Sequence, residues 1–175
     1  TNAFTGESES PIVQPYWLTS IRQGSDMYVV YAGQKKVYAT EGSTHYDMTR
    51  STGGDYSMST SKGWTGGVMG GVVFLNNGVD APQAWVGPPS LTNKLTDLAN
   101  WPSGALCQSL RSFKQFMIAM DYTNGAGTNY PRLLKWSTGA SFNAVPSSWD
   151  ETDSTLDAGE YELADTPGEV VDGAE

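Results

Sequence analysis

Short apolar stretches alternate with turn-forming residues along much of this chain. Residues 27–32 are dense in β-branched and aromatic side chains, and a second such stretch, 37–40, follows a short turn that contains Gly33. Two stretches spaced in this way predict a β-hairpin. Residues 45–50 predict a third strand, and residues 56–59 predict a short fourth one. The first third of the chain is therefore expected to be β-structure.

The segment 72–83 has the sequence Val-Val-Phe-Leu-Asn-Asn-Gly-Val-Asp-Ala-Pro-Gln, an apolar strand followed by turn residues. Asn77 and Gly78 can supply the two positive φ angles that a type I′ turn requires. We therefore expect residues 72–75 to pair with a return strand at 84–86 across a tight turn at these two residues.

The segment 105–122 permits two interpretations. Apolar residues recur there at spacings of four and three, which is typical of an amphipathic helix: Leu106, Leu110, Phe113, Met117 and Met120. Phe116 and Ile118 lie off that face, however, and two strands that turn near Arg111 fit equally well. The flanking segments predict a short helix or packed loop at 91–101 and a strand at 133–137, in which Trp136 is expected to fill a core site.

The composition favours an all-β fold. The 175 residues include 20 Gly, 9 Pro, 5 Phe, 6 Trp and 9 Tyr, which suits many short strands joined by turns. The length suits one domain with a buried core. Cys107 is the sole cysteine, so it cannot form an intrachain disulfide and is expected to be buried. No run of 18 apolar residues and no signal-like segment occurs, so no membrane anchor is expected.

Charge divides the chain into two parts. The net charge is -9, but residues 1–149 carry all 10 Lys and Arg and 9 of the 19 acidic residues. Residues 150–175 carry the other acids and no base, and such a segment is typically solvated or disordered. We expect β-blades over 1–149 and an acidic connector over 150–175 that leads toward a further strand. Without a basic stripe, direct recognition of nucleic acid is not expected.

Residues that could carry chemistry have simpler interpretations. His45 and Asp47 lie two apart on one predicted strand, and no nucleophile elbow accompanies them. The acids Asp150, Asp153, Asp157 and Glu160 lack the spacing of an EF-hand loop. The glycines at 66, 67, 70 and 71 precede a strand, so they suit sharp bends better than a phosphate loop. We expect no catalytic, cofactor-binding or metal-binding residues, and hence no enzyme.

Several short motifs follow one another along residues 28–160. They are Tyr-Val-Val-Tyr-Ala-Gly at 28–33, Thr-Arg at 49–50, the segment 72–83, Arg-x-Phe-Lys-x-Phe at 111–116, Asn-Tyr-Pro-x-x-x-x-Trp-Ser at 129–137, Trp-Asp at 149–150 and Ala-Gly-Glu at 158–160. In this order they resemble the nozzle, or tail tubular, proteins of short-tailed bacteriophages. Hairpins at roughly 40 to 50 residue spacing also suit propeller blades.

The resemblance implies an all-β, β-propeller-like fold, with antiparallel blades that form part of a longer chain. It also resolves the segment 105–122 toward strands. It implies a virion structural protein, assembled in the host cytoplasm, that joins a homo-oligomeric ring around the DNA exit channel. Its partners would be further copies and neighbouring tail or adaptor proteins, and DNA would pass without sequence-specific binding.

Two alternatives to this function follow from the residues. Exposed Trp and Tyr rings could bind sugars, and with a suitable carboxylate pair they would make a carbohydrate-binding or glycosidase-like domain. An interaction propeller of a cellular protein is the other alternative.

Overall fold

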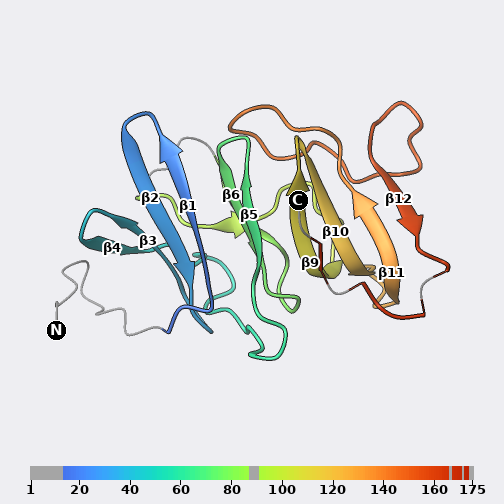
Figure 1. The fold of residues 1–175 in the computed structure, drawn as a ribbon, viewed down its shortest axis with the longest axis horizontal. Helices are drawn as coiled ribbons and strands as arrows, with labels where there is room; N and C mark the ends of the chain where they lie inside the picture. The colour runs from blue at the N-terminus through green and yellow to red at the C-terminus, as the bar shows by residue number, and fades with distance from the viewer. Residues whose placement is uncertain (1–13, 87–90, 166, 171, 174–175) are drawn as a thin grey trace.

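A computed structural model describes residues 14–86, 91–165, 167–170 and 172–173. The described chain consists of twelve strands in three four-stranded antiparallel sheets, and it contains no helix (Figure 1). The expected all-β class is therefore confirmed. In each sheet the strands are neighbours in sequence order, so every connection within a sheet is that of a meander.

Sheet A is the N-terminal meander. It comprises β1 (Trp17–Gln23), β2 (Asp26–Ala32), β3 (Val37–Glu41) and β4 (Thr44–Asp47). The predicted hairpin is present, because Val30 pairs with Ala39 across β2 and β3. Residues 56–59 are not a strand. Tyr56 and Met58 are instead buried in the connection to the next sheet, where their amides donate to carbonyls of the β2–β3 turn.

Sheet B is the central meander. It comprises β5 (Thr65–Met69), β6 (Val72–Asn76), β7 (Gln83–Trp85) and β8 (Thr96–Asp97). Phe74 pairs with Ala84, which confirms the predicted strand pairing. The tight type I′ turn is wrong, because only Gly78 has a positive φ and the connection runs through residues 77–82. The Asn77 side chain shapes this loop by accepting hydrogen bonds from the amides of Val79 and Asp80.

Sheet C is the C-terminal meander. It comprises β9 (Leu106–Phe113), β10 (Phe116–Thr123), β11 (Asn129–Trp136) and β12 (Gly159–Glu162). Residues 105–122 are thus two strands, and their turn lies at Lys114 and Gln115 rather than near Arg111. The segment 91–101 is a loop that holds the short β8. Within the segment expected to be an acidic connector, residues 159–162 form the outermost strand of this sheet.

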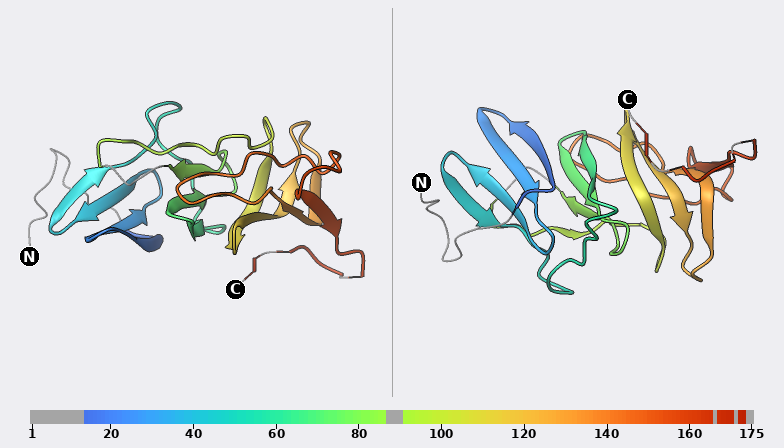
Figure 2. Two further views of the ribbon diagram at one scale, coloured as in Figure 1. Left: turned by 90° about the horizontal axis from the view of Figure 1, so that it is seen from above. Right: turned by 60° about the horizontal axis from the view of Figure 1, so that its bottom comes forward.

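The three sheets stand in a row and pack face to face (Figure 2). The first strands of the sheets lie beside one another, since β5 contacts both β1 and β9. Sheet B is covered on both sides. Val73, Leu75 and Trp85 pack against sheet A, whereas Val72 and Phe74 pack against sheet C. This double burial explains why β6 is continuously apolar instead of alternating.

A long connection between β11 and β12 ties the three sheets together. It leaves β11, crosses toward the β5–β6 turn and returns to β12 (Figure 1). At its tip the amide of Asn143 donates to the carbonyl oxygen of Gly70. The Asn143 side chain accepts a hydrogen bond from Gln23 Nε2 at the end of β1. The tip therefore touches sheets A and B, while both ends of the connection belong to sheet C.

Candidate functional site

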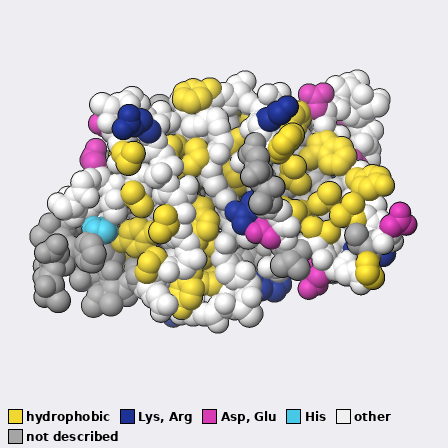
Figure 3. Space-filling model, viewed as in Figure 1, with side chains coloured by type: hydrophobic (Ala, Val, Ile, Leu, Met, Phe, Trp, Pro, Cys, Tyr) yellow, Lys and Arg dark blue, Asp and Glu magenta, His cyan; other side chains and the backbone are white. Residues whose placement is uncertain are grey.

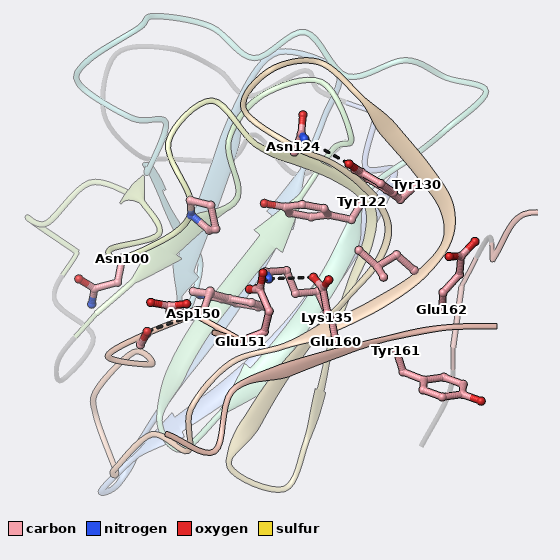
Figure 4. Close-up of a pocket in the computed structure, with 14 residues that line it drawn as sticks. Asn100, Tyr122, Asn124, Tyr130, Lys135, Asp150, Glu151, Glu160, Tyr161 and Glu162 are labelled. Carbon is pink, nitrogen blue, oxygen red and sulfur yellow. Dashed lines mark hydrogen bonds and ion pairs between the residues drawn. The ribbon is translucent and has the colours of Figure 1, made fainter. Parts of the chain in front are cut away.

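A pocket of about 710 Å3 opens beside β10, β11 and β12. Its walls come from these strands, from the loop before β9 and from the segment that begins at Trp149. The residues that line it include Tyr122, Tyr130, Lys135, Glu151 and Glu160. Figure 4 shows Lys135, Glu151 and Glu160 meeting at the centre of the site, with Tyr122 and Tyr130 on one side of them. The size is typical of a small-molecule site.

Lys135 organises the floor of this pocket. Its side chain is 4% exposed, and its Nζ lies between the carboxylates of Glu151 and Glu160, 3.1 Å from Glu160 Oε2. The ammonium also lies 5.6 Å from the centre of the Tyr122 ring. A buried lysine needs such partners, because an unpaired ammonium in the interior would be costly.

The pKa values in the pocket follow from this arrangement. Burial acts to raise the pKa of Glu151, but the hydrogen bond and charge of Lys135 outweigh it, so the net pKa is lowered. Burial, aided by the charges of Glu151 and Glu160, raises the pKa of Tyr122 to about 12. At neutral pH the site therefore holds a carboxylate at Glu151 and a neutral phenol at Tyr122.

The acidic residues weighed in the sequence do not gather into a metal site. Asp150 and Asp153 each accept hydrogen bonds from the amide and hydroxyl of the threonine two residues later. These are local turn contacts. Across the described ranges, no group of three or more potential ligands is placed to hold a metal ion. Asp150 and Glu160 do line the pocket.

His45 and Asp47 have separate partners. His45 Nδ1 lies 2.8 Å from the hydroxyl of Tyr31. Asp47 accepts a hydrogen bond from the amide of Thr49 and pairs with Lys36 at 3.3 Å. The carboxylate is thus held by its own neighbours, and these contacts do not make it the orienting partner of a catalytic base.

The glycines at 66, 67, 70 and 71 lie at close strand contacts and at a turn. Gly66 has φ +141°, and a Cβ there would lie 2.2 Å from the Phe74 carbonyl oxygen. Gly70 and Gly71 form the β5–β6 turn, and a Cβ on Gly71 would lie 2.3 Å from Asn143 Oδ1. Glycine is required at Gly66 because the β6 backbone approaches it there, and it is favoured at Gly71 by a φ of +85°.

Polar residues of the motif at 72–83 bind neighbouring segments through hydrogen bonds and an ion pair. Asn76 Nδ2 donates to the carbonyl oxygens of Cys107 at 3.0 Å and Gln108 at 3.2 Å, which links sheet B to sheet C. Asp80 pairs with Arg50 at 2.8 Å and accepts a hydrogen bond from Asn77. Burial acts to raise the pKa of Asp80, but these contacts outweigh it and lower the pKa. The polar residues of the motif therefore hold loops together.

Sequence reasoning named Glu160 and Asp150 but missed Lys135, which organises the floor of the pocket, and Tyr122, which lines its wall. The sequence around Lys135, between Leu134 and Trp136 in a strand, does not indicate that the lysine is buried.

Within the described part of the chain, no helix has the length and hydropathy needed to cross a bilayer. Comparison with protein families and with curated proteins finds no match to this chain.

Proposed function

We propose that this chain is a structural assembly module, a set of blades in the nozzle ring of a phage tail. The observation that carries the proposal is the repeated stacking of four-stranded meanders, with β1, β5 and β9 adjacent. Sheets arranged in this way are the units of a β-propeller. The motifs at 28–160 supply the link to phage nozzle proteins.

The outer face of sheet C supports a role in assembly. Ile118, Leu134 and Trp136 lie on this face, away from sheet B, and each is partly exposed. Tyr161 extends the same face and is 62% exposed. Figure 3 shows apolar side chains gathered on this side of the molecule. A face of this kind suits contact with another sheet, because the equivalent faces of sheet B are both covered.

The segment after β12 runs back toward β9. Arg111 donates from Nε and Nη2 to the two carboxylate oxygens of Asp172, at 2.8 and 2.5 Å. The same guanidinium donates to the Gly66 carbonyl oxygen of β5. After β4 and after β8 the chain likewise returns from an outer strand to a first strand. Residues 172–173 therefore lie beside β9, the first strand of sheet C.

The first strands carry little charge. Within β1, β5 and β9 the charged residues are Arg22 and Arg111, and Arg111 is paired with Asp172. In a propeller these strands line the central channel. A wall with few cations would let DNA pass without binding it, since phosphate contacts dominate affinity for DNA. The net charge of -9 acts in the same direction.

Native mass spectrometry of the chain over a range of concentrations tests the proposal. We expect closed oligomers of defined size, formed through the outer faces of the end sheets. Ile118→Lys should reduce their abundance, because it places a charge on the outer face of sheet C. Phe142→Lys is the control, since Phe142 is 71% exposed on the long connection and not on that face. A monomer at every concentration would contradict the proposal.

The same experiment separates assembly from chemistry. His45→Ala and the double change of Asp150 and Asp153 to Ala should leave the oligomers intact, because none of these side chains lies on the outer face of sheet C. Loss of oligomers in either variant would show that the interface lies elsewhere.

A further inference from the structure

We propose that the pocket beside β10, β11 and β12 binds a pyranose sugar, with protonated amino sugars preferred over neutral sugars and acidic sugars excluded. Sugar binding there would be separate from ring assembly, since Ile118, Leu134 and Trp136 of the outer face do not line the pocket. It rests on the hydrogen-bonding groups, the rings and the charges that line the pocket.

The floor presents donors and acceptors side by side. Lys135 has three N–H groups, of which Glu151 and Glu160 engage two, and each of these carboxylates has two oxygens that can accept hydrogen bonds. A sugar hydroxyl both donates and accepts. Neighbouring hydroxyls of a pyranose ring therefore match a carboxylate–ammonium–carboxylate row, which is already fixed in place by its own ion pairs.

The walls supply rings for the apolar face of a sugar. Tyr130 is 39% exposed, and its hydroxyl lies 3.5 Å from Asn124 Nδ2. Tyr122 lies beside it and edges onto Trp101, with ring centres 6.1 Å apart. Figure 4 shows the two tyrosines on the same side of the carboxylate–lysine cluster. Tyrosine pairs an apolar ring with a hydrogen-bonding hydroxyl, which suits a ligand with C–H faces and hydroxyl edges.

The charges select among sugars. Asp150, Glu151, Glu160 and Glu162 line the pocket, against Lys135 as its one basic lining residue. The excess of carboxylates favours an ammonium substituent on the ligand and disfavours a carboxylate. Trp149 also lines the pocket, is 2% exposed, and its indole Nε1 has no hydrogen-bond partner among the described residues. The wall of the pocket therefore combines carboxylates with a buried indole.

The inferred activity is binding and not cleavage. A glycosidase needs one protonated carboxylic acid beside the scissile bond, with its pKa raised. Lys135 instead lowers the pKa of Glu151 and pairs with Glu160. The central carboxylates therefore serve as hydrogen-bond acceptors.

Saturation-transfer NMR on the full chain tests the ligand class. The probes are glucosamine, glucose, glucuronate and n-butylamine, each titrated to about 50 mM, since affinities near the millimolar range are expected for a single sugar ring. Glucosamine should bind most tightly, glucose more weakly, and glucuronate not at all. Binding of n-butylamine as tight as that of glucosamine would overturn the proposal, because it would show recognition of the ammonium alone. Absence of sugar binding would overturn it too.

Two matched pairs of variants locate the site. Tyr130→Ala should weaken glucosamine binding about fivefold, whereas Tyr130→Phe keeps the ring and should retain most of it. Tyr16→Ala is the control, because Tyr16 is also 39% exposed but lies before β1. Asp150→Asn should narrow the preference for glucosamine over glucose, whereas Asp153→Asn, in an equivalent exposed turn outside the pocket, should not. Equal effects of Tyr130→Ala and Tyr16→Ala, or of Asp150→Asn and Asp153→Asn, would show that the sugar binds elsewhere.

Discussion

Asn76 offers the sharpest test of how the sheets are joined. Its side chain is buried, with the residue 1% exposed, and Nδ2 lies within hydrogen-bonding distance of Cys107 O, Gln108 O and Thr65 Oγ1. The amide thus holds the end of β6 to β9 across the boundary between sheets B and C. Replacing Asn76 by Ala removes the donors and leaves buried carbonyl oxygens without this partner.

The expected cost follows from the number of groups affected. An NH2 group can make two good hydrogen bonds at a time, and each buried polar group left unsatisfied costs about 1–3 kcal/mol. Asn76→Ala should therefore lower the free energy of unfolding by about 2–4 kcal/mol. For a chain of this length the melting temperature should fall by roughly 5–15 °C.

Two further variants separate hydrogen bonding from packing. Asn76→Asp keeps the shape but turns a carboxylate toward carbonyl oxygens, so it should destabilise at least as much as Asn76→Ala. Asn129→Ala is the exposed control, since it also removes two side-chain hydrogen bonds, to Asp121 and Thr123, and should cost less than about 1 kcal/mol. Urea denaturation followed by tryptophan fluorescence measures all three. A stable Asn76→Asp variant would refute the hydrogen-bond account.

Three other predictions concern local strain, pH and tryptophan burial. Gly66→Ala should cost about 2–4 kcal/mol, because its Cβ would meet the β6 backbone, whereas Gly127→Ala, with φ +84° and open space, should cost about 1 kcal/mol by denaturation. Hydrogen bonding from Arg111 lowers the pKa of Asp172 from 3.8 to about 2. The docking of residues 172–173 should therefore be complete above pH 4 and lost as the pH falls toward 2. Hydrogen exchange measures this pH dependence, which should be absent in Asp172→Asn because Asn does not titrate. Trp85→Ala should cost about 3–5 kcal/mol because Trp85 is 2% exposed, and calorimetry should show a smaller loss for Trp136→Ala.

The sequence predicted strands that are dense in apolar, aromatic and β-branched residues. The β2–β3 hairpin and the pairing of β6 with β7 belong to this group. β1 was missed because its polar and apolar residues are mixed, and β12 was missed because acids flank Tyr161 on an exposed edge strand. Neither strand has a run of apolar or β-branched residues that would predict it from sequence, and each is stabilised by pairing with its neighbour in the sheet.

The ambiguity at 105–122 has a specific cause. In β10 both faces carry apolar residues: Met117 and Ala119 are buried in the core beside sheet B, whereas Phe116 and Ile118 on the other face are partly exposed. Apolar residues on both faces hide the period of two that marks a strand. The apolar positions then fall by chance at helical spacings. The expectation that Trp136 fills the core was wrong for a related reason, because a partly exposed apolar face looks the same in sequence as a buried one.

The candidate pocket depends on contacts that sequence cannot specify. Lys135 meets Glu151 and Glu160 because the long connection brings residues 149–151 back over β11. Without that return, the same lysine would belong to an exposed strand. The sequence shows that Lys135, Glu151 and Glu160 are charged, but it does not show that the fold brings them together.

The long connection between β11 and β12 has a consequence for the folding rate. The bond between Gln23 and Asn143 joins residues 120 positions apart, and the connection can reach Gly70 only after sheets A and B have formed. Closing such a large loop costs chain entropy before any contact repays it. The connection should therefore dock late, as the final step that locks three independently formed meanders into one cooperative unit.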